Sequence, residues 1–271
     1  MDLREFFKMA LVLSAFGSCL IVPLLLIKPV TTKKLSAKWQ YCVWIAVLAA
    51  MVFPAYKLVP ARQAQKIAVA AQKGDTVPTG NIGGAVYNAP AEYGDLTLPN
   101  GINLFRTAAY IWIFGVCVFL LTVFVSYAAY MCRKRKNSAP IAESSVFDSV
   151  KNELNIRRNI KIRMSADVGS PMLAGVFFPT VYIPCREIPA DSMRMVLLHE
   201  LMHYKRKDLL IKWLAIFVNA VHWFNPLCYL ACANLSQACE VSCDLAVTKN
   251  MSEAEQKLYM RTILDLVEEG S

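Results

Sequence analysis

The chain has 271 residues, of which 56% are hydrophobic, and its mean hydropathy is +0.39. This apolar content exceeds the roughly 45–50% of an average soluble domain, even though that figure includes glycine, so it indicates an integral membrane protein. The net charge of +9 could attract nucleic acid, lipid headgroups or an acidic partner. Because much of the positive charge lies in short clusters beside apolar runs, it favours membrane topology, and we expect no direct nucleic-acid binding.

Three apolar runs have about the length that crosses a bilayer, and they predict a membrane domain over 1–132 with spans at 6–27, 39–59 and 105–132. The connection at 28–38 is short and basic, and four consecutive cations follow the third run at 133–136. The longer connection at 60–104 carries only three lysines and arginines. The positive-inside rule therefore predicts that the N-terminus and the 60–104 loop lie outside and that the chain from 133 onward is cytoplasmic.

The cytoplasmic part, 133–271, mixes helical and extended patterns. Pro179 interrupts one extended piece, which demotes that piece to an edge strand or a bent strand. Asp191 is a plausible N-cap for the helix that follows. The pattern predicts a helix over 141–154, a strand over 160–164, and extended pieces over 171–175 and 176–184.

A short motif on that helix carries the chemistry. His199, Glu200 and His203 form an H-E-x-x-H sequence, which uses two of the three histidines in the chain. Residues at i and i+4 share one helix face, so both imidazoles can reach one metal ion. Glu200 lies about 100° around the helix from His199 and can act on a water without ligating the metal. This spacing is typical of zinc hydrolases whose glutamate is the general base.

A catalytic zinc site takes three protein ligands, and Glu240 is the first candidate for the third. Asp244 shares its helix face and could accept the second ring N–H of a histidine ligand. Two alternatives stay open. His222 is the only other histidine, although its position before Trp223 at an expected turn favours a structural or interfacial role. Cys239 and Cys243 could instead complete a closed structural site, which would leave Glu200 without a purpose.

The apolar stretch at 209–233 resembles a fourth span, but a single crossing would separate Glu240 from His199 by about 30 Å of hydrocarbon. Pro226 interrupts the stretch, leaving pieces of about 14–16 and about 10 residues that are too short to cross comfortably. We therefore expect a broken helical hairpin over 208–235 that dips into the inner leaflet or packs under the catalytic domain. The alternative is an ordinary span with no third ligand beyond it.

These residues resemble the Bla/Mec-type sensor-transducer metallopeptidases. The resemblance implies a mainly α, integral membrane protein with three transmembrane helices and a cytoplasmic α+β, gluzincin-like domain that holds a small sheet. It implies zinc held by His199, His203 and Glu240, with Glu200 as catalytic base. It is carried by His199-Glu200-x-x-His203-x-x-Arg206-x-Asp208, by His222-Trp223-Phe224-Asn225-Pro226, by Glu240-x-x-Cys243-Asp244 and by the segment 170–184.

In the best-known members of that family, an outer sensor domain detects beta-lactam antibiotics and activates the inner protease. A DNA-binding repressor is then lost and resistance genes are induced. The 271 residues contain no S-x-x-K signature of penicillin binding. Two explanations stay open: the sequence is a piece of a longer protein, or the chain senses through a separate partner or the 60–104 loop. In either case we expect no beta-lactam recognition by these residues.

The expected function is a membrane-bound zinc endopeptidase that cleaves a cytoplasmic protein, for which a repressor is one candidate, or itself. Glu200 would take a proton from the attacking water and pass it to the leaving amine. The extended segment 176–184 could pair with the substrate as an added strand. Two alternatives are a signalling scaffold with structural zinc and a quality-control protease of the membrane.

Overall fold

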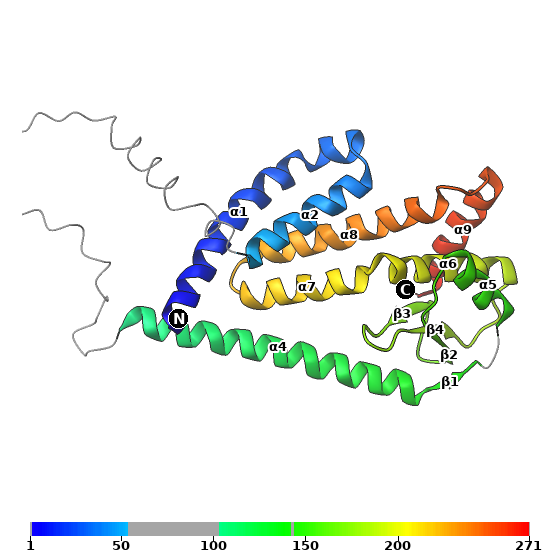
Figure 1. The fold of residues 1–271 in the computed structure, drawn as a ribbon, viewed down its shortest axis with the longest axis horizontal. Coiled ribbons are helices and arrows are strands. Elements are labelled where there is room, and N and C mark those ends of the chain that lie inside the picture. Colours follow the sequence, from blue (N-terminus) through cyan, green and yellow to red (C-terminus); the bar gives the residue numbers. More distant parts are fainter. Residues whose placement is uncertain (1, 54–102, 142–143, 271) are drawn as a thin grey trace, which may run out of the picture.

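The computed structural model describes residues 2–53, 103–141 and 144–270. Helices dominate it, and a small mixed sheet accompanies them, as the sequence predicts (Figure 1). The helices are α1 (Leu3–Lys34), α2 (Ala37–Val52), α4 (Leu104–Lys136), α5 (Ser145–Glu153), α6 (Ala190–Arg206), α7 (Asp208–Val221), α8 (Pro226–Thr248) and α9 (Glu253–Gly270). The strands are β1 (Ser138–Pro140), β2 (Lys161–Ser165), β3 (Met172–Ala174) and β4 (Thr180–Pro184).

Two of the described helices, α1 with 32 residues and α4 with 33, are long and apolar enough to cross a membrane, whereas α2 is a shorter apolar helix. The basic loop expected at 28–38 is wrong, because α1 continues to Lys34 with Pro29 inside it. Apolar helices tolerate proline where neighbouring groups satisfy the freed backbone. Only Leu35 and Ser36 connect α1 to α2, and Ser36 caps α2 by accepting the Trp39 amide at 3.3 Å. The expected end of the second span and nearly all of the 60–104 loop lie outside the described residues.

Two helices joined by a turn lie where the broken helical hairpin is expected. Helix α7 ends at Val221, a short turn follows, and α8 begins at Pro226, where the Asn225 side chain accepts the Leu227 amide at 3.0 Å. Proline suits this first helical position because its missing N–H would have no helical partner there. The second arm is longer than predicted, since α8 runs without a break for 23 residues to Thr248.

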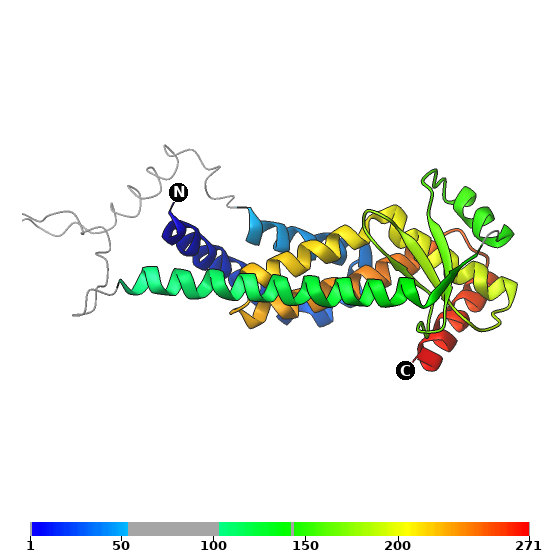
Figure 2. The ribbon, with the colours of Figure 1, turned by 90° about the horizontal axis from the view of Figure 1, so that it is seen from below.

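The hairpin lies among the apolar helices and not beneath the part of the chain that holds the sheet. Figures 1 and 2 show α7 and α8 running alongside α1, α2 and α4, with their turn directed toward the end where α1 and α4 begin. At that turn the Asn225 amide donates to the Ser14 and Ser18 hydroxyls at 2.8 and 2.9 Å, and His222 Nε2 lies 3.2 Å from the Met51 carbonyl. Polar groups in an apolar layer need such internal partners, so these contacts fix the turn.

The sheet has the order β1-β2-β4-β3, in which β2 and β4 are parallel and the outer pairs are antiparallel. The prediction that Pro179 marks an edge or bent strand is wrong, because β4 lies inside the sheet and all five of its residues are buried. Pro179 precedes the first paired residue, Thr180, so its missing N–H interrupts no β4 bond, while its carbonyl accepts the Lys161 amide at 3.2 Å. The edge beside α6 is formed by β3.

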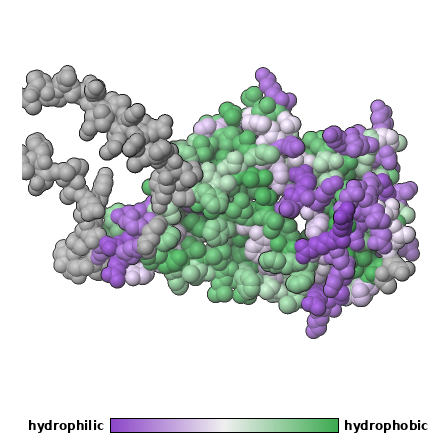
Figure 3. All heavy atoms as spheres, viewed as in Figure 1, coloured by the Kyte–Doolittle hydropathy of each residue, from purple (hydrophilic) through white to green (hydrophobic). Residues whose placement is uncertain are grey.

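The molecule is elongated, and on the face shown in Figure 3 apolar surface covers the helical half, with hydrophilic surface toward both ends. A separate core lies in the other half, where α6 packs between α5, the sheet, α8 and α9. This core gathers buried apolar side chains from each of these elements and includes Val150, Val181, Leu197, Leu201, Val247 and Tyr259. The motif helix is therefore fixed from several sides at the junction of the two halves.

Candidate metal centre

The motif helix starts one residue earlier than its expected cap. Helix α6 begins at Ala190 after Pro189, and Asp191 lies in its first turn without capping it. The apolar residues around the motif, including Leu197, Leu198 and Leu201, are buried. His199 and His203 consequently share the face that meets α8.

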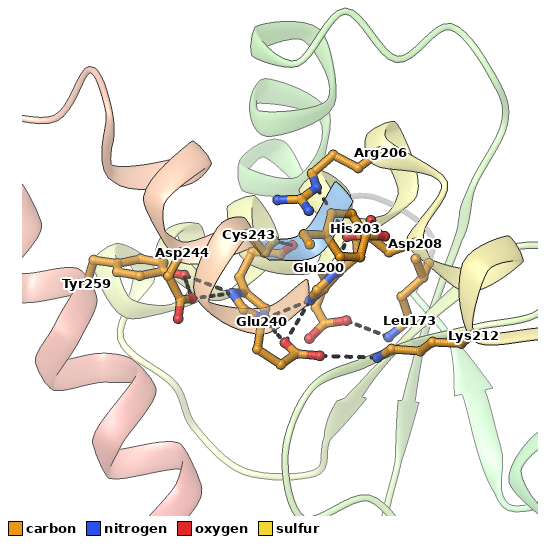
Figure 4. A network of polar contacts seen from close by, with 12 residues as sticks. Leu173, Glu200, His203, Arg206, Asp208, Lys212, Glu240, Cys243, Asp244 and Tyr259 are labelled. Atoms are coloured by element: carbon orange, nitrogen blue, oxygen red, sulfur yellow. Dashed lines mark hydrogen bonds and ion pairs between the residues drawn. The ribbon is translucent and has the colours of Figure 1, made fainter. Parts of the chain in front are cut away.

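Three predicted ligand atoms converge at this point (Figure 4). The Nε2 atoms of His199 and His203 lie 3.1 Å apart, and Glu240 Oε2 lies 3.1 Å from His203 Nε2 and 3.6 Å from His199 Nε2. Two donors at about 2.0–2.1 Å from a tetrahedral zinc ion are about 3.3 Å apart. Two imidazoles and a carboxylate at this spacing fit a catalytic zinc ion.

His199 is oriented by residues from α8 and α9. Its Nδ1 lies 2.8 Å from the Tyr259 hydroxyl and 3.2 Å from Asp244 Oδ1, and the same hydroxyl donates to Asp244 at 2.6 Å. Burial alone would lower the pKa of His199, but hydrogen bonds to Asp244 and Glu240 outweigh it and raise the pKa to about 9. A proton on Nδ1 leaves the Nε2 lone pair facing Glu240, so the predicted partnership of Asp244 with a histidine fits this geometry.

His203 is oriented by two residues, Asp208 and Tyr41, that the spacing of the motif does not predict as its partners. Its Nδ1 lies 2.8 Å from Asp208 Oδ2, while the other oxygen of Asp208 accepts the Tyr41 hydroxyl at 2.8 Å. Asp208 is only 1% exposed, and Arg206 Nε lies 3.3 Å from its Oδ2. The signal for Asp208 was its place in the resembling motif, whereas nothing local pointed to Tyr41 on α2.

A left-handed residue brings Asp208 back to His203. Lys207 has φ +61° and ψ +30°, and it ends α6 and begins α7. This conformation costs a non-glycine residue roughly 1–2 kcal/mol, and it bends the chain between two helices that both run antiparallel to α8. The carboxylate that follows then lies at the start of α7, where the helix dipole favours negative charge.

Glu200 lies between the histidines and the edge of the sheet. Its Oε2 accepts the Leu173 amide of β3 at 2.7 Å. Burial raises the pKa of Glu200, although the neighbouring His199 and His203 pull it down. A carboxylate with a raised pKa is a better base near neutral pH.

The second oxygen of Glu240 has its own partner. Lys212 of α7 donates to Glu240 Oε1 at 3.2 Å, and both side chains are close to half exposed. Glu240 therefore offers Oε2 to the histidines while Lys212 holds Oε1. Helices α6, α7 and α8 meet here. The chain must therefore return through the hairpin for Glu240 of α8 to reach the histidines of α6.

The alternative ligands fit less well. Cys243 comes within metal-ligand reach of both histidines, and Cys239 within reach of His203 and Asp208. Burial raises the pKa of the Cys243 thiol, and only the thiolate is a strong ligand. His222 is buried at the hairpin turn against Met51, which agrees with the structural role predicted for it. Glu240 best completes the set because its oxygen faces both Nε2 atoms.

Several known proteins are similar to this chain. The chain is 34% identical to the regulatory protein BlaR1 of Bacillus licheniformis over 160 residues, which is 57% of this chain. It is 27% identical to the methicillin resistance mecR1 protein of Staphylococcus aureus strain Mu50 over 168 residues, which is also 57% of this chain. These matches span about a quarter of each relative, 26% and 27% of their lengths. The model of the family described as BlaR1 peptidase M56 matches residues 6–271. The chain therefore belongs to the BlaR1 peptidase M56 family.

Proposed function

We propose that this chain is a membrane-bound zinc endopeptidase of a regulatory signalling system, with His199, His203 and Glu240 as metal ligands and Glu200 as catalytic base. The observation that carries the proposal is the convergence of the two Nε2 atoms with Glu240 Oε2 at 3.1–3.6 Å, directly beside Glu200. Membership of a peptidase family supports the reaction class.

The proposed reaction is hydrolysis of a peptide bond. Bound at these ligands, zinc would supply the Lewis acid that polarises the scissile carbonyl and activates a water molecule. As the water oxygen attacks the carbonyl carbon, Glu200 accepts the proton and then delivers it to the amide nitrogen as the C–N bond breaks. The contact from Leu173 orients Glu200, and the two carboxylates behind the histidines hold the imidazoles in place.

We propose that substrate adds to the sheet along β3, not along 176–184. Strand β4 pairs on both sides and offers no free edge, whereas β3 pairs only with β4 among the described strands. The Leu173 amide points away from β4 toward Glu200. A peptide laid along this edge would lie beside the base and the ligands, and its backbone would supply affinity.

The proposal includes a membrane topology. Residues 1–132 form a membrane domain with three spans and an outer loop at 60–104, and 133–271 form the cytoplasmic peptidase domain with the hairpin 208–235. The basic ends of α1 and α4, Lys33–Lys34 and 133–136, point toward the same end of the molecule as the peptidase part (Figure 1). Both clusters on one side agree with a cytoplasmic location of that side.

The named relatives are a regulatory protein and a methicillin resistance protein, so we propose a role in regulating antibiotic resistance. The substrate would be a cytoplasmic protein, with a transcriptional repressor as the first candidate, or the chain itself. A separate sensor partner or the 60–104 loop would supply the stimulus.

The test is Glu200→Gln in the full chain in membranes. We expect zinc content to be unchanged and cleavage to fall by about 10²–10⁴-fold, the usual contribution of a general base. Proteomic comparison of cells carrying the two forms would reveal the substrate as a fragment that disappears. Equal cleavage by the variant would contradict the assigned base, and zinc without cleavage in the unmodified chain would favour a signalling scaffold. Fragments derived from misfolded membrane proteins, and none from a soluble regulator, would favour quality control.

A further inference from the structure

Two aromatic side chains at the tip of the β3–β4 loop are almost fully exposed. Phe177 is 77% exposed and Phe178 is 83% exposed. Comparable exposure of large apolar side chains occurs on the apolar helices, for example 74% at Leu26 of α1 and 70% at Phe114 of α4. Neighbouring exposed aromatic residues mark a surface that something apolar covers.

The loop is built to hold this tip. Gly175 has φ +89°, and a Cβ atom there would come within 2.5 Å of the Phe178 carbonyl oxygen. Only glycine adopts this conformation without strain. Arg158, from the segment before β2, donates to the Phe177 carbonyl. The chain therefore presents the two rings on a fixed turn.

The tip points toward the apolar half of the molecule. In Figures 1 and 2 the β3–β4 loop extends from the sheet beside the start of α7, at the level of the connection between α1 and α2 along the long axis. Aromatic residues also lie near the start of α7, where Trp213 packs edge-on against Tyr127 of α4 with their ring centroids 5.1 Å apart. Such aromatic residues are enriched where hydrocarbon meets headgroups.

Cations surround the base of the loop. A cavity of about 410 Å³ lies beside Gly175 and Val176, and no acidic residue among those described lines it. Positive charge near a bilayer attracts anionic headgroups. The cations that line the cavity are Arg157, Arg158, Lys205 and Lys207.

We propose that Phe177 and Phe178 insert into the inner leaflet of the same membrane, with these cations on anionic lipid headgroups, and so seat the sheet on the bilayer. An aromatic tip with a basic rim at the interfacial level matches a lipid surface better than a protein groove, where the cations would need acidic partners. The seated loop would fix β3, which directly precedes it, against the membrane. The inference rests on the membrane placement in the proposed function.

The experiment places 4-fluorophenylalanine at position 178 of the full chain in nanodiscs of phosphatidylcholine and phosphatidylglycerol. Fluorine relaxation is measured with a 5-doxyl lipid and, separately, with a soluble gadolinium chelate. Two reference positions receive the same label. Phe114 on α4 reports a lipid-facing span, and Met260 on α9, which is 61% exposed, reports an apolar residue in water.

We expect the doxyl lipid to broaden the signals from 178 and 114 but not from 260, and the gadolinium chelate to relax only 260. Relaxation of 178 by gadolinium to the same extent as 260 would overturn the proposal. Protection of 178 from both agents would also overturn it, because a substrate or a second copy of the chain would then cover the tip. If 114 itself is not broadened by lipid, the membrane placement fails, and that failure is separate from the one at 178.

Discussion

The two histidines of the candidate centre lie four residues apart on one helix, yet they depend on different parts of the molecule. His199 is held by Asp244 and Tyr259, both within the peptidase part. His203 is held by Asp208 at the start of the hairpin, and Asp208 is held in turn by Tyr41 of α2. One ligand is thus oriented locally, and the other is oriented through a helix of the apolar half. The difference offers a physical route by which α2 can affect the proposed metal centre.

The largest expected effect comes from Asp208→Asn, with Asp244→Asn as its matched control. Partners behind metal-bound histidines typically contribute 10–100-fold to metal affinity, so both variants should bind zinc more weakly in competition with a chelator. Asp208 is fully buried between His203, Tyr41 and Arg206, and breaking a buried ion pair costs about 3–5 kcal/mol. Asp208→Asn should therefore also lower the thermal midpoint, and by more than Asp244→Asn, whose side chain is 41% exposed in the native chain.

A smaller effect is expected from Tyr41→Phe. It removes a hydrogen bond to a carboxylate, which contributes about 1.5–3 kcal/mol, and it leaves the ring packed under Arg206. Zinc affinity should fall by less than in Asp208→Asn.

A double-mutant cycle measures whether Tyr41 acts through Asp208. The effects of Tyr41→Phe and Asp208→Asn on zinc affinity should be strongly non-additive, whereas Tyr41→Phe and Asp244→Asn should add. Additivity in both pairs would show that Tyr41 of α2 does not act on His203 through Asp208. The two histidines would then not differ in their dependence on the apolar helices.

The smallest expected effect belongs to Lys207→Gly. Glycine relieves the left-handed conformation at φ +61° but gains freedom in the unfolded chain, so the free energy of unfolding should change by no more than about 1 kcal/mol. Zinc affinity should be unchanged, because Asp208 keeps its position. Lys207→Val is the contrasting variant, since a β-branched residue is poorly tolerated at positive φ, and it should destabilise the α6–α7 junction. Equal thermal midpoints for the two variants would show that this turn does not set the position of Asp208.

Patterns of neighbouring residues in the sequence predicted the pair of histidines and the helical hairpin. The i, i+4 spacing of His199 and His203 was sufficient to bring both rings together, and Asn225-Pro226 was sufficient to predict the hairpin. Contacts between distant segments had no such signal. Tyr41 and Asp208 are hydrogen-bonded although 167 positions separate them in the chain. The residue pattern of an apolar helix does not reveal which of its side chains makes a single polar contact. The prediction from Pro179 was wrong because proline in an extended run is compatible both with an edge strand and with the first residue of an inner strand. Only the pairing of the strands distinguishes the two.

Zinc content per chain tests the central claim most directly. It is measured by mass spectrometry of the metal on the full chain purified from membranes, alongside Glu240→Ala and Cys243→Ala. We expect about one zinc ion per chain in the unmodified protein and in Cys243→Ala, because three protein ligands form a catalytic site, and a large loss in Glu240→Ala. Retention of zinc by Glu240→Ala together with its loss from Cys243→Ala would contradict the account, because the histidines would then belong to a closed structural site.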